Sequence, residues 1–566
     1  MCGIWALFGY DANDVRQFTC AQTIAHRGPD NFRFENVSGL RSAKLAFHRL
    51  EVVGDVGGMQ PMRLHQYPHL TLICNGEIYN CQKLKEEFGF NHETPSDCEV
   101  ILHLYNKFGP EETSKYLDGV FAYVIVNTRD NTLLLSRDTY GVRPMFYFMT
   151  NNGMMGVCSE AKGLYDLLKK KNGEDKTKLL RVFPPAHSMV CDVIKNGKIA
   201  PATPKMFHSF PELPRHFMYQ GVVLEKGESD DVIKKNIRTL MINAVEKRLM
   251  SSRRVGSLLS GGLDSSLVAA ITAKKLRENG SKQPIQTFSI GMETSPDIVA
   301  ARKVAEQIES EHHEVIFSPE EGLDAIEETI YALESYDVTT VRASIPMYLL
   351  SKYISQNTDT IVIMSGEGAD ELAQGYIYFY KQPTQEEGDV ESRRLLSDLY
   401  LFDVLRTDRS TAAHGLEVRA PFLDHALTSY YLSLPAEKRA PTYLKGNIEK
   451  FLLRSAFDES DLIPSEILWR RKEAFSDGVA SKRRSWFEIL QEHIESRVSD
   501  DALAKAKETH PFHTPKTKEA LYYRQIFESK FGPQLSKLIP YQWLPKWIEA
   551  VDPSARVLTH YQNDEA

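Results

Sequence analysis

Two patterns of apolar and polar positions follow one another along the chain. In residues 2–191, short apolar runs such as LTLICNG, FAYVIVN and TLLLSRD are separated by turn sequences such as NTRDN and TNNG. Such runs predict stacked antiparallel sheets, and helical stretches such as SDCEVILHLYNKF predict helices that cover them. We therefore expect an α+β domain with αββα layers over residues 2–191.

From residue 233 the pattern alternates between strand and helix. RRVGSLLS, PIQTFSIG, HHEVIFS and TIVIMSG have the pattern of strands, and LDSSLVAAITAKKLREN and SPDIVAARKVAEQIES have that of helices. The alternation predicts an α/β domain with a parallel sheet covered on both faces, where ligands bind at the carboxyl ends of the strands. This domain should span residues 233–545, with a mainly helical C-terminal part.

Two segments lack a sustained period. Residues 192–232 contain KNGKIAPATPKMFHSFPELPRHF, which is rich in Pro, Lys and His and predicts a linker. Residues 546–566 end in DPSARVLTHYQNDEA and predict a polar, mobile tail.

Composition narrows the classes of protein. The 566 residues are 42% hydrophobic with a net charge of −8, which indicates neither disorder nor a nucleic-acid footprint. Apolar runs such as GVFAYVIV are far shorter than the roughly 20 residues that span a bilayer. The first residues lack a basic n-region, so we expect a cytoplasmic protein. The seven cysteines all lie within the first 191 residues, and an odd count without CxxC supports neither a disulfide framework nor a zinc site.

The start of the chain, MCGIW, places a cysteine directly after the initiator methionine. If Met1 is removed, Cys2 carries an α-amine, which titrates near ~7.7–8.0, beside a thiol that titrates near ~8.5. The neutral amine can then take the thiol proton and generate a nucleophilic thiolate. On this pair alone the alternative, an inert thiol, is the better interpretation.

The segment SGGLDSS, Ser260–Ser266, lies between a predicted strand and a predicted helix. Two glycines and a helix N-terminus favour a phosphate site. The segment has neither the GxxxxGK[ST] nor the GxGxxG pattern. Asp264 would repel a bare phosphate, so its presence implies a Mg²⁺ ion between the two. The alternative is a tight turn with Asp264 as a helix cap.

The segment SGEGADE, Ser365–Glu371, also follows an apolar strand. Glu367, Asp370 and Glu371 are three carboxylates framed by glycines, which suits metal coordination and orientation of a substrate. The alternative is an exposed acidic turn.

Taken together, these motifs resemble the glutamine-dependent asparagine synthetases over nearly the whole chain. In the first half, MCGIWALFG, AHRGPD, FHRL, CNGEIYN, SDCE, LDGVFA and RDTYGVRP are similar to class II glutaminase motifs in order and spacing. In the second half, SGGLDSS is similar to a pyrophosphate loop, and SGEGADE, TTVRAS, HGLEVRAPFLD and KEAFSDG match the synthetases. The resemblance thus identifies the α/β half as a pyrophosphate-loop, ATP-binding domain.

For the first half, the resemblance implies that Cys2 becomes the N-terminal residue and attacks the side-chain amide of glutamine. Arg49 would hold the α-carboxylate, Asp97 the α-ammonium, and Asn75 and Gly76 the oxyanion. The remaining residues of the implied glutamine site are Leu50, Glu51, Val52, Val53 and Glu77. Two departures from the family pattern, RLEVVG at Arg49–Gly54 and PPAH at Pro184–His187, replace no residue assigned to chemistry.

For the second half, the resemblance implies that ATP adenylates the β-carboxylate of aspartate and that ammonia attacks the resulting anhydride. Asp264 and Asp370 would hold Mg²⁺, Glu367 would deprotonate or orient the ammonia, and Lys472 would neutralise phosphate charge. Thr339 and Arg342 are weaker candidates for aspartate binding. The ATP-binding set is Leu258, Ser260, Gly261, Gly262, Asp264, Ser265, Ser266, Ile290, Ser365 and Gly366.

Several alternatives remain. Amidotransferases that make glucosamine phosphate or phosphoribosylamine share the first half but lack SGGLDSS with SGEGADE. β-Lactam synthetases share the second half but lack the nucleophile. An amidotransferase acting on another carboxylic acid, or an inactive scaffold of the same fold, is a further alternative. The expected partners are glutamine, aspartate and ATP, without nucleic acid or membrane, and a homo-oligomer is left open.

Overall fold

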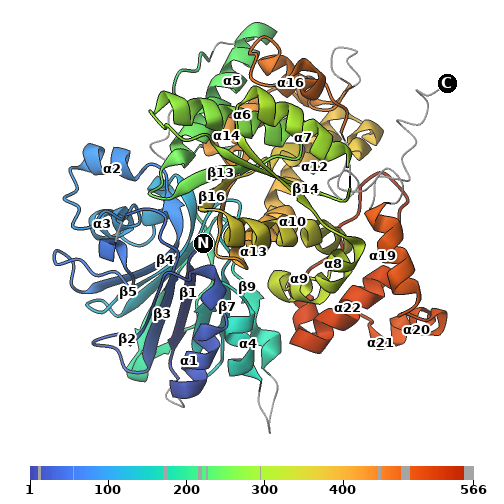
Figure 1. The fold of residues 1–566 in the computed structure, drawn as a ribbon. Helices are drawn as coiled ribbons and strands as arrows, with labels where there is room; N and C mark the ends of the chain where they lie inside the picture. The colour runs from blue at the N-terminus through green and yellow to red at the C-terminus, as the bar shows by residue number, and fades with distance from the viewer. Residues whose placement is uncertain are drawn as a thin grey trace.

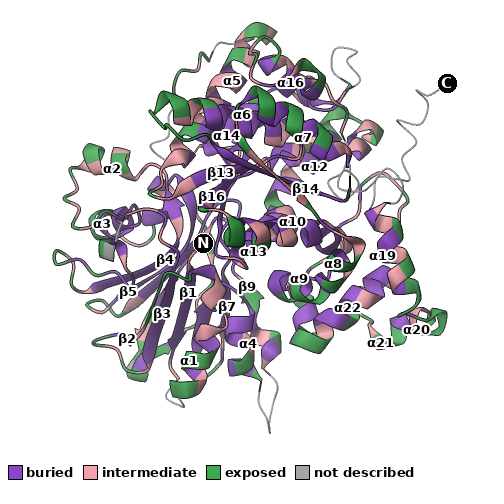
Figure 2. Cartoon of the chain, viewed as in Figure 1, coloured by how far each residue is buried: buried purple, intermediate pink, exposed green. Residues whose placement is uncertain are grey.

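Three β-sheets organise the chain in the computed structural model (Figure 1). The structure describes residues 1–10, 14–54, 56–169, 176–213, 219–224, 227–293, 295–442, 448–472 and 485–553. Two sheets belong to the first half of the chain and one to the second half. The central strands of the sheets are buried in Figure 2.

The first sheet has six antiparallel strands in the order β2-β3-β1-β8-β7-β9. Its central strand β1 begins directly after Cys2 and pairs with β3 in a register that sets Gly3 opposite His48. Cys2 is therefore next to the end of β3, where Arg49 lies. The strands are β1 (Gly3–Phe8), β2 (Asn31–Asn36), β3 (Ala43–Arg49), β7 (Phe146–Met149), β8 (Met155–Cys158) and β9 (Arg181–Val182).

The second sheet is also antiparallel, with the order β11-β10-β6-β5-β4 and a further short strand, β12, paired with β10. Its edge strand β4 sets Asn75 opposite Ala122 and Gly76 opposite Phe121 on β5. The strands are β4 (Leu70–Ile78), β5 (Gly119–Asn127), β6 (Thr132–Arg137), β10 (His187–Ile194), β11 (Lys198–Ile199) and β12 (Lys205–Met206).

The two antiparallel sheets pack face to face and are covered by helices on both outer faces. Their shared core is apolar and includes Ile4 and Phe47 from the first sheet and Ile73 and Val124 from the second. Two helices cover each outer face: α1 (Asp14–Gln22) with α4 (Lys162–Leu168), and α2 (Cys81–Phe88) with α3 (Glu99–Phe108). The predicted αββα fold of the first half is thus confirmed, because the apolar runs give each sheet one face to bury against the other sheet and one to bury under helices.

The third sheet is parallel, with the order β15-β14-β13-β16-β17. Its strands are β13 (Arg254–Leu258), β14 (Gln286–Gly291), β15 (Glu311–Ile316), β16 (Thr360–Met364) and β17 (Glu417–Arg419). The chain extends the sheet on one side of β13 through β14 and β15, and then on the other side through β16 and β17. A reversal of this kind opens a crevice at the carboxyl ends of the strands, where ligands bind in open α/β sheets. SGGLDSS follows β13 and SGEGADE follows β16, so both motifs lie at this crevice.

Helices cover both faces of the parallel sheet, as the alternating pattern predicts. One face packs against α5 (Asp230–Glu246), α6 (Leu263–Glu278) and α14 (His425–Ser433), together with α16 (Phe451–Phe457). The other packs against α10 (Val338–Asn357) and the C-terminal helices. Further helices are α7 (Pro296–Gln307), α8 (Pro319–Asp324), α9 (Ile326–Leu333), α12 (Gln385–Asp398), α13 (Asp403–Ala412), α19 (Trp486–Glu495), α20 (Asp500–Ala504), α21 (Ala506–Thr509) and α22 (Lys518–Phe531). The α/β class with a helical C-terminal part is confirmed.

The segments predicted as linker and tail contain strand pairing and aromatic packing, respectively. Strand pairing of the first half continues through β10 and β11 to β12, which lies inside the predicted linker. In the predicted tail, Trp547 and Ile548 pack against an aromatic cluster, and residues 554–566 lie outside the described part. The predicted domain bounds stay predictions.

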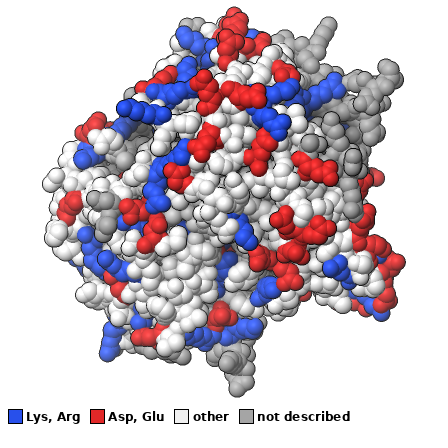
Figure 3. Space-filling view, in the orientation of Figure 1, with Lys and Arg blue, Asp and Glu red and all other residues white. Residues whose placement is uncertain are grey.

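Acidic and basic side chains are interspersed on the face of the molecule in Figure 3. A continuous basic surface, which a nucleic-acid partner requires, is not present on that face. Among the described residues, no helix combines the length and apolar character needed to cross a membrane.

Candidate active sites

The predicted nucleophile lies where the two halves of the chain meet (Figure 1). Cys2 is half-buried, and its thiol donates to the carbonyl oxygen of Leu50 at 3.6 Å. The carbonyl oxygen of Cys2 accepts a hydrogen bond from Nε of buried Arg27 at 3.0 Å. Met1 is buried, and its α-amino group donates to the carbonyl oxygen of Leu416 at 3.0 Å. The backbone around Cys2 is therefore held from both halves of the chain.

Burial keeps the Cys2 thiol protonated while Met1 precedes it. Desolvation raises the pKa of Cys2 to about 12, and it lowers the pKa of the Met1 α-amino group to about 5. Only the thiolate is a nucleophile, so this upward pKa shift disfavours attack by the thiol at neutral pH. Removal of Met1 would place a free α-amine on Cys2 itself.

The two charged residues predicted to hold the ends of glutamine come together. Arg49 ends β3 and Asp97 precedes α3, and both are buried. A Cβ atom on Gly58 would lie 3.1 Å from Nη2 of Arg49 and 3.4 Å from Cβ of Ser96, the neighbour of Asp97. Burial raises the pKa of Asp97 to about 6, although its carboxylate accepts the N–H of Ile78 at 2.6 Å. Burial destabilises the charged carboxylate of Asp97, and a cationic partner would offset this cost.

The predicted oxyanion donors lie on the edge strand β4. Asn75 is buried, and its Nδ2 has no hydrogen-bond partner among the residues that the structure describes. An unpaired buried amide donor is costly unless a ligand satisfies it. A Cβ atom on Gly76 would lie 2.3 Å from the carbonyl oxygen of Val120, so this position must be glycine. The geometry suits an oxygen-binding donor pair.

The loop after Arg49 supplies the rest of the predicted glutamine site and reaches the second half. Leu50 and Val52 are buried, and Val53 packs against the core of the second half. The N–H of Glu51 donates to Asp30 Oδ2 at 2.7 Å. The carbonyl oxygen of Val52 accepts the N–H of Ser252 at 2.7 Å.

Both departures from the family pattern coincide with left-handed backbone. Gly54 has φ +76°, so glycine is the favourable residue at the end of RLEVVG. In PPAH, Ala186 has φ +58°, although it carries a Cβ atom. The second departure therefore introduces local backbone strain away from the residues assigned to chemistry.

Buried ion pairs that the sequence did not predict join the two halves. Nη1 of Arg27 contacts Glu160 at 2.7 Å and Asp408 of α13 at 3.0 Å. Glu77 on β4, a predicted glutamine-site residue, lies 3.7 Å from Nη2 of Arg419 on β17. Burial raises the pKa of Glu77, and nearby carboxylates raise it further. The glutaminase residues thus contact the edge strand of the parallel sheet directly.

The two predicted ATP-binding loops pack against each other. A Cβ atom on Gly366 would lie 2.8 Å from the backbone N of Ser265, so the close approach of the loops requires glycine. Within the first loop, Oγ of Ser265 lies 3.0 Å from Oγ of Ser260. The loop therefore turns tightly into the N-terminus of α6, where the helix dipole favours an anion.

A cavity opens between these loops. The volume of the cavity is about 1110 Å³ when the open space at its mouth is included, which is large enough for a nucleotide. Among the predicted site residues, Gly261 is packed against Ala300 and Ser266 is fully buried, and neither lines the cavity. The predicted residues that line it are Leu258, Ser260, Gly262, Asp264, Ser265, Ile290, Ser365, Gly366, Glu367, Asp370 and Lys472.

The carboxyl group of Glu367 has a pKa shifted towards neutral pH. Nη2 of Arg406, on α13, donates to both carboxylate oxygens of Glu367 at 3.0 and 2.9 Å. Burial nevertheless raises the pKa of Glu367 to about 7, with contributions from Asp403 and Asp370. A carboxylate tuned to this range is suited to general-base chemistry.

Two lysines hold the carboxylates predicted to bind Mg²⁺. Nζ of Lys450 contacts Asp264 and lies 2.5 Å from Oδ1 of Asp370, and Nζ of Lys472 lies 2.6 Å from Oδ2 of Asp370. These lysines hold the pKa of Asp370 below its usual range, despite its burial. The Oδ1 atom of Asp264 is buried and has no hydrogen-bond partner in the described part of the chain. Two convergent carboxylates with a spare oxygen fit a hard divalent cation.

Reasoning from the sequence missed most of the positive charge in this cavity. Lys450 is only 2% exposed and comes from KGNIEKFLLR, which has no spacing that marks a site. Arg470 and Arg471 directly precede the predicted Lys472, so this basic run was a usable signal. The unpredicted basic residues lining the cavity are Arg406, Lys450, Arg454, Arg470 and Arg471.

The structure does not bring the two weaker aspartate candidates to the cavity. Arg342 is buried on α10, where Nη2 contacts Glu519 at 2.7 Å and Asp552 at 2.8 Å. Neither Arg342 nor Thr339 lines the cavity. The rest of the predicted KEAFSDG motif, residues 473–478, lies outside the described residues.

Comparisons with known proteins cover both halves. The asparagine synthase family model matches residues 236–394 and 383–548, and the glutamine amidotransferase domain model matches residues 1–199. The asparagine synthetases (glutamine-hydrolyzing) of Gallus gallus and Homo sapiens are 57% and 56% identical, covering 100% of this chain and 99% of each relative. A solved glutamine phosphoribosylpyrophosphate amidotransferase from B. subtilis is 16% identical with a TM-score of 0.30, covering 55% of this chain and 81% of that chain. The last likeness is too low to bear on the chemistry.

Proposed function

The chain belongs to the glutamine-hydrolysing asparagine synthetases, and from this premise we propose how its residues divide the reaction. The reaction converts L-aspartate to L-asparagine with nitrogen from L-glutamine, through β-aspartyl-AMP, and gives glutamate, AMP and pyrophosphate. The observation that carries the proposal is that one chain combines an N-terminal cysteine site with a separate basic and acidic cavity at the carboxyl edge of a parallel sheet. The assignments below rest on contacts in those two places.

Glutamine hydrolysis is assigned to the first half. The α-amine of Cys2, free once Met1 is removed, takes the thiol proton, and the sulfur attacks the amide carbon of glutamine. Nδ2 of Asn75 and the N–H of Gly76 stabilise the oxyanion. The α-ammonium of Cys2 then gives the thiol proton to the amide nitrogen, and the C–N bond breaks to release ammonia. Arg49 and Asp97 hold the α-carboxylate and α-ammonium. Water then cleaves the thioester to glutamate.

Aspartate activation is assigned to the cavity of the second half. The β-carboxylate attacks the α-phosphorus of ATP, and pyrophosphate departs towards the Ser260–Ser266 loop and the N-terminus of α6. Asp264 and Asp370 would hold Mg²⁺ together with ATP, and the ion would neutralise phosphate charge when bound. Lys450 and Lys472 add positive charge that the transition state needs more than the ground state.

Amide formation is assigned to Glu367. Ammonia attacks the β-carbonyl carbon of β-aspartyl-AMP and AMP leaves. The nitrogen must lose a proton in this step, and the carboxylate of Glu367 is the acceptor. Arg406 orients that carboxylate through both of its oxygens.

Other features of the proposal rest on the sequence. We keep the glutaminase domain at residues 2–191, the linker at 192–232, the synthetase domain at 233–545 and the tail at 546–566. A cytoplasmic location and the open question of a homo-oligomer also stay as predictions.

A single labelling experiment tests the reaction. The purified enzyme is given aspartate, MgATP and glutamine with ¹⁵N in its side-chain amide, and the products are separated by mass spectrometry. We expect ¹⁵N-asparagine together with glutamate, AMP and pyrophosphate in equal amounts. Formation of ADP and phosphate, or a labelled amide of a different acid, would contradict the proposal.

A further inference from the structure

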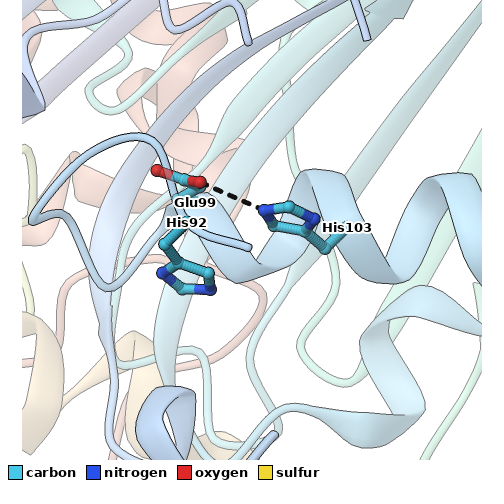
Figure 4. A group of neighbouring side chains, drawn as sticks. All are labelled: His92, Glu99 and His103. Atoms are coloured by element: carbon cyan, nitrogen blue, oxygen red, sulfur yellow. Dashed lines mark hydrogen bonds and ion pairs between the residues drawn. The ribbon is translucent and has the colours of Figure 1, made fainter. Parts of the chain in front are cut away.

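A cluster of two imidazoles and one carboxylate lies in the first half, outside both active sites (Figure 4). Glu99 and His103 are one turn apart on α3, and His92 comes from the loop that precedes the helix. One ligand atom from each of the three residues lies within 4.8 Å of the others. In Figure 4 the carboxylate of Glu99 and the ring of His103 face each other, and the ring of His92 lies beside them.

Two of the three residues are buried, and the third, half-buried His92, has a free ligand position. Glu99 is fully buried and His103 is 1% exposed. Nε2 of His92 is buried and has no hydrogen-bond partner among the described residues. A buried imidazole nitrogen without a partner costs free energy, which a ligand at that nitrogen would recover.

Neighbouring groups hold the two helical residues in place. The carboxylate oxygens of Glu99 accept the N–H groups of Glu93 and Thr94, each at 2.6 Å. Nδ1 of His103 lies 3.2 Å from the hydroxyl of Tyr67, and its Nε2 lies 3.0 Å from Oε1 of Glu99. Metal-binding histidines and carboxylates are oriented by hydrogen bonds of this kind to their other atoms.

We propose that His92, Glu99 and His103 form a binding site for a divalent transition-metal ion of the Zn²⁺ class. Two imidazoles and one carboxylate suit zinc, whereas Mg²⁺ and Ca²⁺ prefer oxygen ligands alone. A water molecule completes the four ligands that zinc takes.

Metal binding requires the imidazole proton of His103 to move from Nε2 to Nδ1. The hydrogen bond between Nε2 of His103 and Glu99 gives way to two bonds to the metal, and the imidazole proton moves to Nδ1. Nδ1–H then donates to the hydroxyl oxygen of Tyr67. The ring of His92 now stacks on that of His103, with ring centroids 5.1 Å apart and an interplanar angle of 4°. His92 therefore needs to swing out of this stack, because each imidazole that binds a metal ion points a ring nitrogen at it. His92 is only half-buried in a loop, so it has room to do so.

The site would connect metal binding to the stability of the glutaminase half. Glu99 anchors the backbone of residues 93–94 and is two residues from Asp97. A metal ion that joins the loop at His92 to helix α3 binds only the folded form. It therefore stabilises that form by mass action.

The experiment measures metal binding directly in the full-length protein, without an affinity tag and with Cys2→Ala so that the reactive thiol cannot ligate metal. Zn²⁺ is titrated by calorimetry, and Co²⁺ is added separately as a spectroscopic probe of tetrahedral nitrogen and oxygen ligation. His92→Gln removes the loop ligand and keeps a polar side chain. His92→Phe removes the loop ligand and keeps an aromatic ring. His493→Gln, a half-buried histidine on α19 outside the cluster, is the matched control.

We expect one Zn²⁺ per chain, a tetrahedral Co²⁺ spectrum without a thiolate band, and a melting temperature that rises with Zn²⁺. Both His92 variants should weaken Zn²⁺ binding at least about tenfold and lose the Co²⁺ spectrum, whereas His493→Gln keeps both. Unchanged binding in folded His92 variants, or no saturable Zn²⁺ binding at all, would overturn the proposal and leave a structural histidine–glutamate pair. Melting curves without metal show whether each variant is folded.

Discussion

At the scale of single residues, we expect the reactivity of Cys2 to depend on the loss of Met1. With Met1 present, burial raises the pKa of Cys2 to about 12, and the α-amine belongs to a different residue. We predict that Cys2→Ala abolishes glutamine-dependent synthesis and leaves ammonia-dependent synthesis largely intact, because the cavity of the second half does not include Cys2.

The measurement is asparagine formation with each nitrogen source, and intact mass spectrometry of the active wild-type enzyme serves as the control. A retained Met1 in active enzyme would refute the role of the α-amine. Parallel loss of both activities in folded Cys2→Ala would refute the division of labour between the two halves.

We expect Glu367 to give asparagine synthesis a pH dependence. Burial raises the pKa of Glu367 to about 7, so its carboxylate form, which accepts the proton, is lost as the pH falls through that value. We predict that kcat for asparagine synthesis at saturating glutamine falls below about pH 7 and that Glu367→Gln lowers it about 10²–10⁴-fold.

The Glu367 prediction is checked by measuring asparagine and glutamate in parallel across pH. Glutamate release by Cys2 should continue in Glu367→Gln and acts as the internal control. Near-normal asparagine formation in the variant would mean that the base lies elsewhere.

Lys450 and Lys472 should differ in importance. Lys450 is almost fully buried and contacts both predicted Mg²⁺ carboxylates, whereas Lys472 contacts one of them. We predict that Lys450→Ala suppresses pyrophosphate release about 10²–10³-fold with either nitrogen source, and that Lys472→Ala has a smaller effect in the same direction. Pyrophosphate is measured with glutamine and with ammonia. Normal pyrophosphate release in folded Lys450→Ala would contradict this assignment.

At the scale of elements, the end of β3 is positioned by a glycine in AHRGPD. A Cβ atom on Gly28 would lie 2.3 Å from the carbonyl carbon and oxygen of His48 and 2.5 Å from N of Arg49. We predict that Gly28→Ala displaces the end of β3 and lowers kcat/KM for glutamine about 10–100-fold, because Arg49 then binds the substrate out of position.

Steady-state kinetics with both nitrogen sources test the Gly28 prediction, since ammonia-dependent synthesis should not change. Gly89→Ala is the control for a glycine replacement without a steric clash, because a Cβ atom there meets nothing within 4 Å and the only cost is backbone strain at φ +65°. Equal losses in the two variants would show that the close approach to β3 is unimportant.

At the scale of the whole molecule, buried ion pairs hold the two halves together. Asp408 on α13 contacts Arg27 at 3.0 Å and Arg143 at 3.9 Å, and all three side chains are almost fully buried. We predict that Asp408→Ala destabilises the docked arrangement by about 3–5 kcal/mol, because it leaves buried arginines without this partner. Calorimetry should then show two separated unfolding transitions, one for each half.

Asp359→Ala serves as the control for Asp408→Ala. Asp359 is an exposed partner of Arg254, so its loss should cost only about 0–1 kcal/mol and leave the calorimetric profile unchanged. A profile of Asp408→Ala that matches the control would contradict the role of the buried ion pairs.

Much of the fold and of both sites could be predicted from local sequence. Short continuous apolar runs identify these strands, because a strand between a shared core and a covering layer of helices buries both faces, and β4, β5 and β6 lie where the runs place them. SGGLDSS and SGEGADE were brought together because loops after neighbouring parallel strands meet at one edge of the sheet. The residue types in these motifs, together with this rule about strand ends, were sufficient to predict that Asp264, Glu367 and Asp370 lie at the cavity.

Only the tertiary structure decided which residues, distant in sequence, form ion pairs with the buried charged groups. Lys450 lies 186 residues from Asp264, and Arg406 lies 39 residues from Glu367. Arg342, a candidate for aspartate, is instead paired with Glu519 and Asp552. Sequence spacing specifies neighbours within an element, but a buried ion must find its partner wherever the packing of elements brings one. Residue types and loops were therefore readable in the sequence, and the partners of the buried charges were set by the fold.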